Sequence, residues 1–553
     1  MILEHIDIRG FRGINKLSLP LTQTNLLIGE NAWGKSSLLD ALSLLLSPHE
    51  PAYVFTEADF HFTPGDVTDA MRRLSVVFHF RDDGNDPDAV LSTFWQRDAQ
   101  GQRQLCYSVS ATWRDSGIET RRRFVDLNYQ LLPEQNCAAA IDLLLKRYPV
   151  LRLRDARFSK RTRSSAPLPT AHPELLAGME TLARDLEHHP QQLSDEVLRQ
   201  GLKTMQQLMQ HYFLVQPPDA GNEVRLRDPQ TREGEQGWRA LDHLNQLIAG
   251  TDSRSRQLIL LQMFTLLIEA RGDVPLAAGA RPLLLIEDPE TRLHPIMLSV
   301  AWNLLRLLPL QKIATTNSPE LLSQVPVENV CRLVRGPSRV AAWRIGPEGL
   351  SAEESRRIGF HIRVNRPAAL FARYWLLVEG ETEVWIMNEL AQQCGYNFAA
   401  EGVKVIEFAQ SGLKPLLKFA RRMGIAWHVL TDGDQAGNKY ASTARTQLQP
   451  GEPEPRFLTQ LPALDMENFL YQHGFQDVYQ HGFQDVYHQM AHLPLNVPMS
   501  SRRIITKAIH QSSKPELAIA VATSAAERGP EAIPPLMRQM FARVIGLAQG
   551  QAD

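Results

Sequence analysis

Two short motifs, separated by most of the chain, constrain this sequence more than any other feature. The first is the run Gly29-Glu-Asn-Ala-Trp-Gly34-Lys35-Ser36 near the N-terminus. The second begins at Val378-Glu379-Gly380-Glu381-Thr382-Glu383 and continues at Asp432-Gly433-Asp434. The first is typical of a loop that holds nucleotide phosphates, and the second of carboxylates that hold a divalent metal. Together they predict an α/β protein with at least two domains.

Length and composition are those of an ordinary globular protein with more than one core. The chain has 553 residues, 43% hydrophobic and 22% charged, with a net charge of −2. No apolar run is long enough to span a membrane, and the first residues lack the layout of a signal peptide. The 4 cysteines are scattered and suggest neither a zinc site nor disulfides, so a reducing cytoplasm is expected.

The N-terminal motif lies in the local context that a phosphate-binding loop requires. The apolar run 24–29 predicts a strand before the loop, and residues 36–46 predict a helix after it. Gly29 and Gly34 permit a tight backbone whose N–H groups face phosphate oxygens, and Lys35 would reach the β- and γ-phosphates. The predicted nucleotide-binding residues are Gly29, Asn31, Gly34, Lys35, Ser36 and Ser37, with the Ser36 hydroxyl on magnesium.

A second part of the nucleotide site is expected much farther along the chain. Residues 281–286 predict a buried strand that ends in Glu287 and Asp288. Such a strand delivers one acid to magnesium and a second to the attacking water; the alternative is a solvated acidic turn. Residues 310–316 predict another strand, which ends at the polar residue Asn317.

These features resemble the ABC-type ATPases of DNA repair, the relatives of RecF and SMC proteins. The resemblance is carried by Ile8-Arg-Gly-Phe-Arg12 and by the run from Glu287 to Pro295. It implies that Glu287 is the magnesium-side acid, that Asp288 is the catalytic carboxylate, and that Leu293-His294 belongs to the D-loop. It also implies a head-to-tail homodimer, in which a signature segment of the opposite subunit completes each nucleotide site.

Three departures from that family predict slow, switch-like ATP hydrolysis. Asn317 stands where a switch histidine is usual, and it can hydrogen-bond a γ-phosphate without carrying a proton. Asp288 is one methylene shorter than the usual glutamate. The best signature candidate, residues 253–257, lacks a Leu-Ser-Gly-Gly sequence.

The region between the two halves of the nucleotide site leaves two questions open. Residues 165–215 predict a compact helical insertion, which either serves dimerisation or packs on the ATPase core. A basic cluster precedes it and reads either as a salt-bridged, solvated face or as a contact for a nucleic-acid backbone. The cluster consists of Arg152, Arg154, Arg157, Lys160, Arg161 and Arg163.

The C-terminal acids follow predicted parallel strands at 374–378 and 425–431. Ligands gather at the carboxyl ends of such strands, and hard oxygen ligands suit Mg²⁺ or Mn²⁺. Glu379 and Glu383 are four residues apart at a helix start and therefore share one face. Two metal ions held by two such acid pairs can activate water against a phosphodiester. The predicted metal ligands here include Glu379, Glu383, Asp432 and Asp434.

These residues resemble a Toprim domain, and an ABC ATPase followed by Toprim resembles the OLD family (overcoming lysogenization defect) of ATP-dependent endonucleases. The resemblance implies that Glu467 is a further metal ligand. It also implies that a lysine assists at the scissile phosphate, with Lys514 the candidate and Lys507 its rival. The catalytic set is then Glu379, Asp432 and Lys514, together with Asp288 of the ATPase.

An eight-residue duplication interrupts this last region, because residues 471–478 are repeated without change as 479–486. If the segment were helical, eight extra residues would rotate the downstream part of the chain by about 80°. Lys514 would then be misplaced unless a loop absorbs the insertion. The duplication also accounts for His473 and His481 without a metal site.

The sequence thus predicts an ABC/RecF-like ATPase domain at 1–345, a linker at 346–369 and a Toprim domain with a C-terminal helical extension at 370–553. The expected function is ATP-gated, two-metal cleavage of DNA by a cytoplasmic homodimer, with ATP and a further Mg²⁺ at the ATPase site. A role in phage defence or DNA repair is expected from family analogy, and the sequence identifies no partner helicase. Two alternatives stay open: an ATPase whose Toprim domain binds nucleic acid without cutting, and a Toprim enzyme that acts on RNA.

Overall fold

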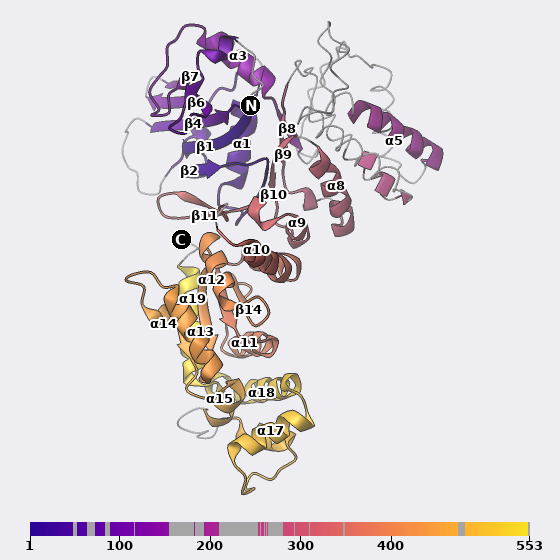
Figure 1. The fold of residues 1–553 in the computed structure, drawn as a ribbon, viewed down its shortest axis with the longest axis vertical. Helices are drawn as coiled ribbons and strands as arrows, with labels where there is room; N and C mark the ends of the chain where they lie inside the picture. The colour runs from indigo at the N-terminus through magenta and orange to yellow at the C-terminus, as the bar shows by residue number, and fades with distance from the viewer. Residues whose placement is uncertain are drawn as a thin grey trace. The chain divides into compact units, whose positions relative to one another are not determined.

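The computed structural model describes two compact units (Figure 1). The N-terminal unit comprises Met1–Val325, Asn329–Val334 and Ser338–Ala342, and the C-terminal unit comprises Pro326–Glu328, Arg335–Pro337 and Trp343–Asp553. The described residues are 1–47, 52–62, 72–82, 89–114, 117–153, 182, 193–209, 253–254, 256–258, 260–261, 263, 280–291, 293–308, 310–346, 349–473 and 482–550.

The first sheet of the N-terminal unit is antiparallel and has the order β2-β1-β4-β6-β5, with β7 paired to β6. Apolar and polar residues largely alternate along these strands, so one face is buried in the main core and much of the other faces solvent. A small buried cluster of Val77, Cys106 and Val125 lies on that second face. The strands are β1 (Ile2–Phe11), β2 (Ile14–Pro20), β4 (Arg72–Arg81), β5 (Gln96–Arg97), β6 (Arg103–Arg114) and β7 (Gly117–Val125).

The second sheet of this unit holds the predicted nucleotide motifs and has the order β12-β11-β3-β10-β9-β8. Strands β11, β3, β10, β9 and β8 run parallel, and β9 and β10 are buried along their length, as parallel strands covered on both faces are. Strand β9 is wholly apolar, whereas β10 also buries the polar residues Gln311, Lys312 and Thr315. The strands are β3 (Thr24–Ile28), β8 (Val150–Leu153), β9 (Leu283–Ile286), β10 (Gln311–Thr315), β11 (Val330–Arg335) and β12 (Val340–Trp343).

One buried cluster joins the two sheets with helix α1, and it includes Ile8, Leu42 and Leu285. The predicted strand–loop–helix order around the glycine loop is confirmed. Of the predicted insertion at 165–215, the described part is mainly helix α5. The helices are α1 (Lys35–Leu45), α2 (Ala89–Ser92), α3 (Cys137–Arg147), α5 (Asp195–Met209), α8 (Pro295–Leu307) and α9 (Pro319–Gln324), with 3₁₀ turns at Glu57–Asp59, Pro289–Thr291 and Val327–Asn329.

The C-terminal unit is built on a fully parallel sheet with the order β14-β13-β15-β16. Alternate residues of β13 point to opposite faces: Tyr374 belongs to one core with the C-terminal helices, whereas Trp375 stacks on Phe419 of α12. The α/β fold class predicted for both halves is thereby confirmed. The strands are β13 (Tyr374–Val378), β14 (Val403–Glu407), β15 (Ala426–Thr431) and β16 (Leu458–Gln460).

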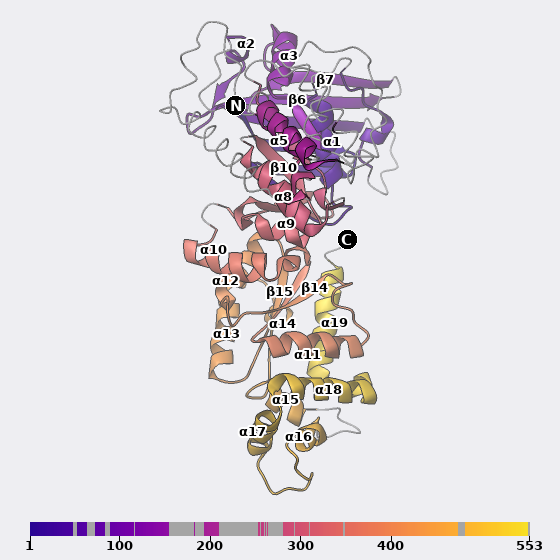
Figure 2. The ribbon, with the colours of Figure 1, turned by 90° about the vertical axis from the view of Figure 1, so that its right-hand side faces the viewer.

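Helices surround this sheet, and α11 and α18 lie side by side (Figure 2). They are α10 (Ala352–Ile358), α11 (Glu381–Gln393), α12 (Leu413–Arg422), α13 (Gln435–Thr446), α14 (Glu454–Phe457), α15 (Met466–Gln472), α16 (Gln484–Met490), α17 (Ser501–Gln511), α18 (Lys514–Arg528) and α19 (Pro535–Gln549), with a π-helical turn at Gly359–Val364 and 3₁₀ turns at Pro367–Phe371 and Pro530–Ala532. Among the helices that the structure describes, none has the length and apolar character needed to cross a membrane.

The segment expected as a linker, 346–369, is largely helical. Its helix α10 begins with a capping box at Ser351 and Glu354, and Glu354 forms an ion pair with Lys418 of α12 (2.8 Å). These contacts tie the segment to the C-terminal unit, because a capped helix with a packed neighbour is not an extended connection.

The duplicated segment does not extend a helix. Helix α15 ends at Gln472, within the first copy, and α16 begins at Gln484, within the second. A Cβ placed on Gly482 would lie 3.2 Å from the His473 backbone nitrogen, so the chain on either side of residues 474–481 meets at one place. The condition for the predicted rotation, one helix running through the duplication, is therefore not met, because α15 ends and α16 begins within it.

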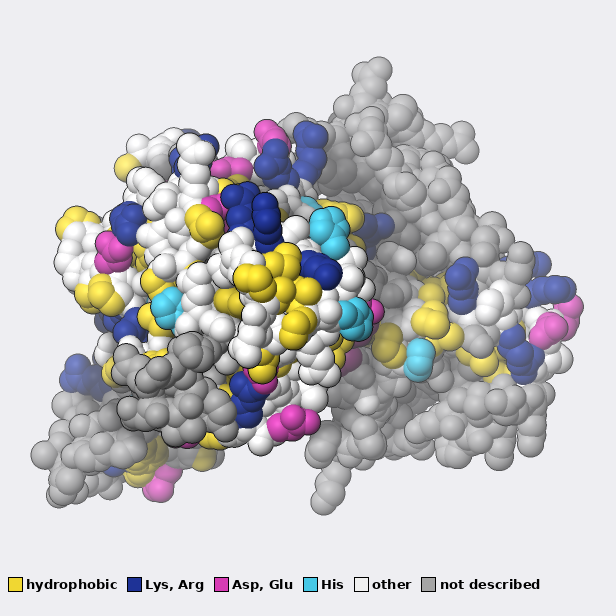
Figure 3. All heavy atoms as spheres, turned by 90° about the horizontal axis from the view of Figure 1, so that it is seen from below, with side chains coloured by type: hydrophobic (Ala, Val, Ile, Leu, Met, Phe, Trp, Pro, Cys, Tyr) yellow, Lys and Arg dark blue, Asp and Glu magenta, His cyan; other side chains and the backbone are white. Residues whose placement is uncertain are grey.

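The lower end of the C-terminal unit exposes hydrophobic side chains beside Lys, Arg and His (Figure 3). Large apolar residues of this unit with high exposure include Leu464, Leu495 and Ile519. Scattered apolar exposure of this kind is normal on protein surfaces.

Candidate functional site

The phosphate-binding loop is shaped by two glycines whose backbone no other residue could adopt without strain. Gly29 and Gly34 have φ of 152° and 92°. A Cβ on Gly29 would lie 2.7 Å from the Leu333 carbonyl oxygen, and one on Gly34 would lie 2.9 Å from the Ile14 side chain. The loop therefore requires glycine at both positions, as predicted, and it leads directly into α1.

Lys35, the first residue of α1, is buried and points back along the loop. Its Nζ donates to the Gly29 carbonyl oxygen and to Asn317 Oδ1, the latter at 3.0 Å. Burial lowers the pKa of Lys35, although the charges of Asp288, Glu290 and Glu30 oppose this effect. Asn317 follows β10, which pairs with β3, so the parallel sheet brings the expected switch position to the lysine. Ser36 is exposed on the first turn of α1, and Asn31 is exposed in the loop.

An aromatic contact, which the motif itself does not reveal, also supports the loop. Trp33 is 3% exposed, and the guanidinium of buried Arg332 on β11 lies 5.7 Å from its ring centroid. A cation over an indole face is attracted by the ring quadrupole. The contact between Trp33 and Arg332 thus ties the loop to β11.

Asp288 adopts a left-handed backbone conformation at the end of β9, with φ of 38°. Its Oδ1 accepts a hydrogen bond from the Thr315 hydroxyl of the neighbouring strand (2.8 Å). Asp and Asn enter this region more readily than other residues with a side chain. The local backbone is thus a physical reason for aspartate at this position.

Arg152 occupies the place beside Glu287, and this corrects one interpretation of the basic cluster. Its Nη2 lies 2.8 Å from Glu287 Oε2, and its Nη1 lies 2.6 Å from Asp40 Oδ1 and 2.9 Å from Ser43 Oγ. The side chain is 10% exposed on β8. A buried guanidinium requires carboxylate partners, so Arg152 is held in ion pairs with Asp40 and Glu287 and is not exposed on a surface for nucleic acid. The other cluster members, 154–163, lie outside the described residues.

The same charge network continues to the turn after β1. Arg12 donates a hydrogen bond to Asp40 Oδ2, the carboxylate oxygen that Arg152 does not use, and it also donates to Asp59 Oδ1 (2.8 Å). Alternating charges therefore link Asp59 through Arg12, Asp40 and Arg152 to Glu287. The sequence does contain a signal for this network, because Arg152 interrupts the apolar run 150–153. A charged residue inside such a run predicts a buried partner of opposite charge.

The signature candidate and the D-loop are only partly described. Arg254 pairs with Asp195 at the start of α5 (2.8 Å), and Ser255 lies outside the described residues. His294 precedes α8 as its N-cap residue. The signature therefore stays a prediction.

In the C-terminal unit, the predicted acids follow strands that are neighbours in the sheet. Glu379 follows β13 and Asp432 follows β15, and the two strands pair in parallel register. Gly433 is required beside Asp432, because a Cβ there would lie 2.3 Å from the Ala463 carbonyl oxygen. The sheet thus brings the two acidic motifs to one edge, as parallel strands do.

Three carboxylates at this edge cap helices. Glu383 Oε2 accepts a hydrogen bond from the Gly380 N–H (2.9 Å). Asp434 Oδ1 accepts one from the Gly437 N–H (2.6 Å), and Asp465 Oδ1 accepts one from the Asn468 N–H (2.7 Å). In this arrangement, no three His, Cys, Asp or Glu side chains of the described part converge on a point that could hold a metal ion.

The electrostatics of the edge nevertheless favour a cation. Burial, followed by the charges of Glu379, Glu383, Asp465 and Glu467, raises the pKa of Asp432 to about 8. Burial and neighbouring acids also raise the pKa of Glu379, whose Oε2 is buried without a hydrogen-bond partner. A buried carboxylate oxygen without a donor, in a cluster of like charges, fits a hard divalent cation.

Lys514 supplies positive charge at this edge. Its Nζ lies 2.7 Å from Oε1 of Glu467, which is 8% exposed. Burial lowers the pKa of Lys514, but the hydrogen bond and charge of Glu467 outweigh it and raise the pKa. Lys514 keeps this position despite the duplication, and its rival Lys507 forms no ion pair with a described carboxylate.

A polar hollow of about 640 Å³ adjoins the Asp432-Gly433-Asp434 turn. Its lining includes Gly433, Asn438, Gln460, Asn468 and Gln472. Side-chain amides donate hydrogen bonds that suit phosphate oxygens.

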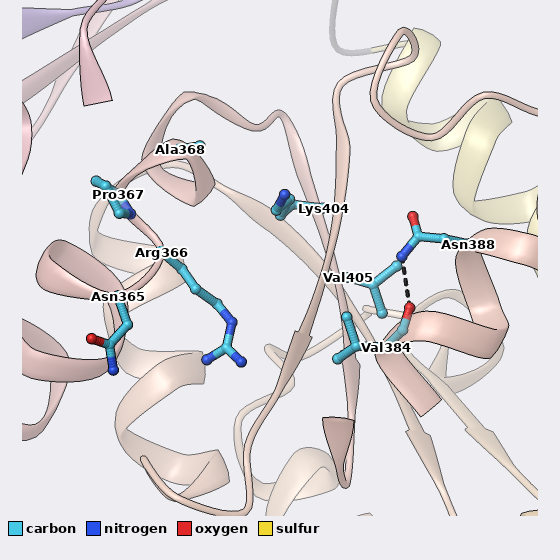
Figure 4. Close-up of a pocket in the computed structure, with 8 residues that line it drawn as sticks. All are labelled: Asn365, Arg366, Pro367, Ala368, Val384, Asn388, Lys404 and Val405. Carbon is cyan, nitrogen blue, oxygen red and sulfur yellow. Dashed lines mark hydrogen bonds between the residues drawn. The ribbon is translucent and has the colours of Figure 1, made fainter. Parts of the chain in front are cut away.

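A second pocket, of about 270 Å³, lies at the edge strand β14 (Figure 4). Arg366 lines it and donates to Glu407 Oε1 (2.8 Å), and Lys404 lies across from it. None of the predicted metal ligands lines this pocket.

Comparison with known proteins gives two family matches. The family described as "Protein of unknown function (DUF2813)" matches residues 1–369, and the one described as "Overcoming lysogenization defect protein-like, TOPRIM domain" matches residues 370–434. The chain is also 54% identical over 561 aligned residues to the "Uncharacterized protein YbjD" of Escherichia coli (strain K12), with 100% of both chains covered.

Solved structures with similarity to parts of the chain include the C-terminal region of the Burkholderia pseudomallei OLD protein. That match has 16% identity and a TM-score of 0.26, and it covers 32% of this chain and 99% of that one. The SMC head domain from Thermotoga maritima matches with 10% identity and a TM-score of 0.29, covering 63% of this chain and 100% of that one. With TM-scores this low, neither structure assigns a role to any residue here.

Proposed function

This chain belongs to the DUF2813 family and carries an OLD-like Toprim domain, and on that premise we propose that it is an ATP-dependent DNA endonuclease. One observation carries the proposal. Among the described residues, six carboxylates gather around one edge of a parallel sheet, Lys514 pairs with one of them, and the buried Glu379 Oε2 has no hydrogen-bond donor. The carboxylates are Glu379, Glu383, Asp432, Asp434, Asp465 and Glu467.

The donor set suits divalent metal ions. Glu379, Glu383, Asp432, Asp434 and Glu467 would hold two Mg²⁺ or Mn²⁺ ions. When bound, such ions supply activation of water and stabilisation of the leaving oxygen of a phosphodiester.

The remaining groups at this edge would handle the DNA backbone. Lys514, which Glu467 orients, would place a fixed positive charge at the scissile phosphate. Asn438 and Asn468 in the adjoining hollow would donate to neighbouring phosphate oxygens, whereas the Gln460 amide already donates to the Asp432 carbonyl oxygen and to Asn438 Oδ1. The short turn at Gly433 keeps the two aspartates on one small element.

At the ATPase site, the loop N–H groups and Lys35 would hold the triphosphate, and Ser36 and Glu287 would hold magnesium. Asp288 would orient water, and Asn317 would hydrogen-bond the γ-phosphate. Because Asn317 carries no charge and Asp288 is short, hydrolysis would be slow. ATP would then act as a switch on DNA cleavage in a cytoplasmic homodimer.

The decisive experiment is cleavage of supercoiled plasmid in Mn²⁺. The wild type should produce nicked and linear DNA, and Asp432→Asn/Asp434→Asn should produce neither. Gln435→Ala, an exposed neighbour on the same turn, is the control and should cleave normally. Equal products from wild type and the double variant would refute the nuclease assignment. For the ATPase half, Lys35→Ala should lose ATP binding, measured by calorimetric titration.

A second candidate function is nucleic-acid binding without cleavage. The capping bonds of Glu383, Asp434 and Asp465 favour it, because these acids already have partners without metal. Plasmid that is retained by the wild type but stays supercoiled in both Mn²⁺ and Mg²⁺ would support this candidate over the endonuclease.

A further inference from the structure

The solvent-facing side of the antiparallel sheet in the N-terminal unit carries a group of exposed cations. Ile8, Val76 and Val109 point into the core, so their neighbours along each strand point outward. The outward cations, which we call the basic sheet face, are Arg9, Lys16, Arg73, Arg114 and Arg121, and all five are exposed.

Strand register aligns several of these residues in one row across the sheet. Arg9 lies opposite Lys16 on β2 and opposite Ser75 on β4, Ser75 lies opposite Ser110 on β6, and Ser110 lies opposite Arg121 on β7. Neighbouring strands are about 4.8 Å apart, so the row spans roughly 19 Å. Cations and hydroxyls therefore form a flat polar strip across five strands.

This strip is electrostatically unfavourable for the protein by itself. Like charges directly opposite each other on antiparallel strands are destabilising, and Arg9 and Lys16 form such a pair. Among the described carboxylates, none forms an ion pair with Arg9, Lys16 or Arg114, whereas Arg121 pairs with Glu119 (2.7 Å). The fold does not require these charges, since the same outward positions would accept neutral polar residues.

We propose that the basic sheet face binds the phosphate backbone of duplex DNA. A polyanion would relieve the Arg9–Lys16 repulsion, and hydroxyls such as those of Ser75 and Ser110 donate to phosphate oxygens. The row itself holds no apolar or aromatic side chain, which protein interfaces use as anchors, and the apolar cluster of Val77, Cys106 and Val125 on the same face is buried. The net charge of −2 does not oppose this, because binding follows clustered charge.

The identity of the partner rests on the proposed function, but the face is separate from the Toprim acids, which lie in the other unit. It also differs from the basic cluster at 152–163, in which Arg152 is buried in ion pairs. The face would thus hold DNA without reading its sequence.

The test is the salt dependence of binding to a fluorescent DNA duplex, measured by anisotropy with chelator present so that no strand is cut. The variant Arg9→Ala/Lys16→Ala/Arg114→Ala should lower the slope of log K against log salt by about 2 to 3, at about 0.9 per phosphate contact. Affinity should fall at least about tenfold within the range of roughly 50 to 200 mM salt. Arg9→Lys/Arg114→Lys should keep the wild-type slope.

The matched control removes three exposed cations elsewhere in the same unit: Lys146→Ala/Lys203→Ala/Arg339→Ala. Melting curves and ATP binding establish that every variant is folded. An unchanged slope in the sheet-face variant, an equal loss in the control, or no duplex binding by the wild type would each overturn the proposal. So would a change in self-association alone, which would make the face an interface between copies.

Failure here and failure of the nuclease assignment have different signatures. Asp432→Ala should lose cleavage and keep the salt slope. If the face variant loses binding while the wild type never cuts, the nuclease assignment fails and the basic sheet face stands. If the wild type cuts plasmid while the face variant binds duplex DNA normally, the proposal for the basic sheet face fails and the nuclease assignment stands.

Discussion

At the scale of single residues, backbone conformation and burial explain the departures that the motifs alone left unexplained. Asp288 has a φ of 38°, which Asp tolerates better than most residues with a side chain. Arg152 is buried where the sequence allowed a surface role, and two carboxylates flank it. Both facts depend on neighbours that lie far away in the sequence.

Removing the Arg152 guanidinium should destabilise the N-terminal unit strongly. Arg152→Ala leaves Asp40 and Glu287 close together without their shared cation, and breaking a buried ion pair in this way costs about 3–5 kcal/mol. Urea unfolding should show this loss in the free energy of unfolding. Arg339→Ala, at an exposed arginine of the same unit, should change it by less than about 0.5 kcal/mol. A similar small change in both variants would contradict the network.

His428 should make the C-terminal unit sensitive to mild acid. It is fully buried, with its ring nitrogens bonded to the Arg456 carbonyl oxygen and the Thr459 hydroxyl, and burial lowers its pKa to about 4. The unfolded chain has the ordinary pKa of about 6.5. The neutral ring therefore stabilises the fold fully above about pH 6.5, and this stability is lost as pH falls towards 4, by about 3 kcal/mol in total.

The measurement is the free energy of unfolding between those two pH values. His428→Gln keeps hydrogen-bonding groups but cannot titrate, so its profile should be flatter than that of the wild type. His510→Gln, at an exposed histidine, should follow the wild type. Parallel profiles for the wild type and His428→Gln would disprove the assignment.

At the scale of elements, the strand ends and their turns build the metal-binding edge. The Asp432-Gly433-Asp434 turn passes so close to the backbone at Ala463 that only glycine fits. The structure thus gives this glycine a specific reason, a close approach between two segments.

Gly433→Ala should therefore cost about 1–3 kcal/mol of stability, as overpacking does, and should displace both aspartates. Loss of Mn²⁺-dependent plasmid cleavage should accompany the lower unfolding free energy. Gly546→Ala is the matched control, because nothing lies within 4 Å of a Cβ there and the residue is inside α19. That variant should gain about 0.5–1 kcal/mol. Equal behaviour of the two would show that the close approach is unimportant.

The duplicated segment is also an element whose consequence depends on its ends. Deleting residues 474–481 joins His473 to Gly482 and leaves one copy of the repeat, and these two residues already lie side by side. The deletion should keep the melting temperature and the cleavage activity, because α15 and the Glu467–Lys514 pair stay in place. A large loss of either would mean that the second copy has acquired a structural role.

At the scale of the whole molecule, the acidic edge should lower the stability of the metal-free protein and raise its stability when metal binds. Crowded carboxylates repel one another without metal, and a ligand that binds the native state stabilises it. Mn²⁺ should therefore raise the melting temperature of the wild type. Asp432→Asn should be at least as stable as the wild type in chelator, yet gain nothing from Mn²⁺. A variant that is less stable in chelator, or that responds to Mn²⁺ like the wild type, would contradict this prediction.

The sequence by itself determined the α/β class, the strand–loop–helix context of Lys35 and the family relationship. These follow from local patterns: glycine spacing, apolar periodicity and acids placed after strands. Only the tertiary structure decided what each charged group touches. It put Arg152 against Glu287, turned Glu383, Asp434 and Asp465 towards helix ends, and brought His473 to Gly482. Such contacts join residues that are distant in the chain, and their energies depend on burial and partner geometry, which local sequence does not encode.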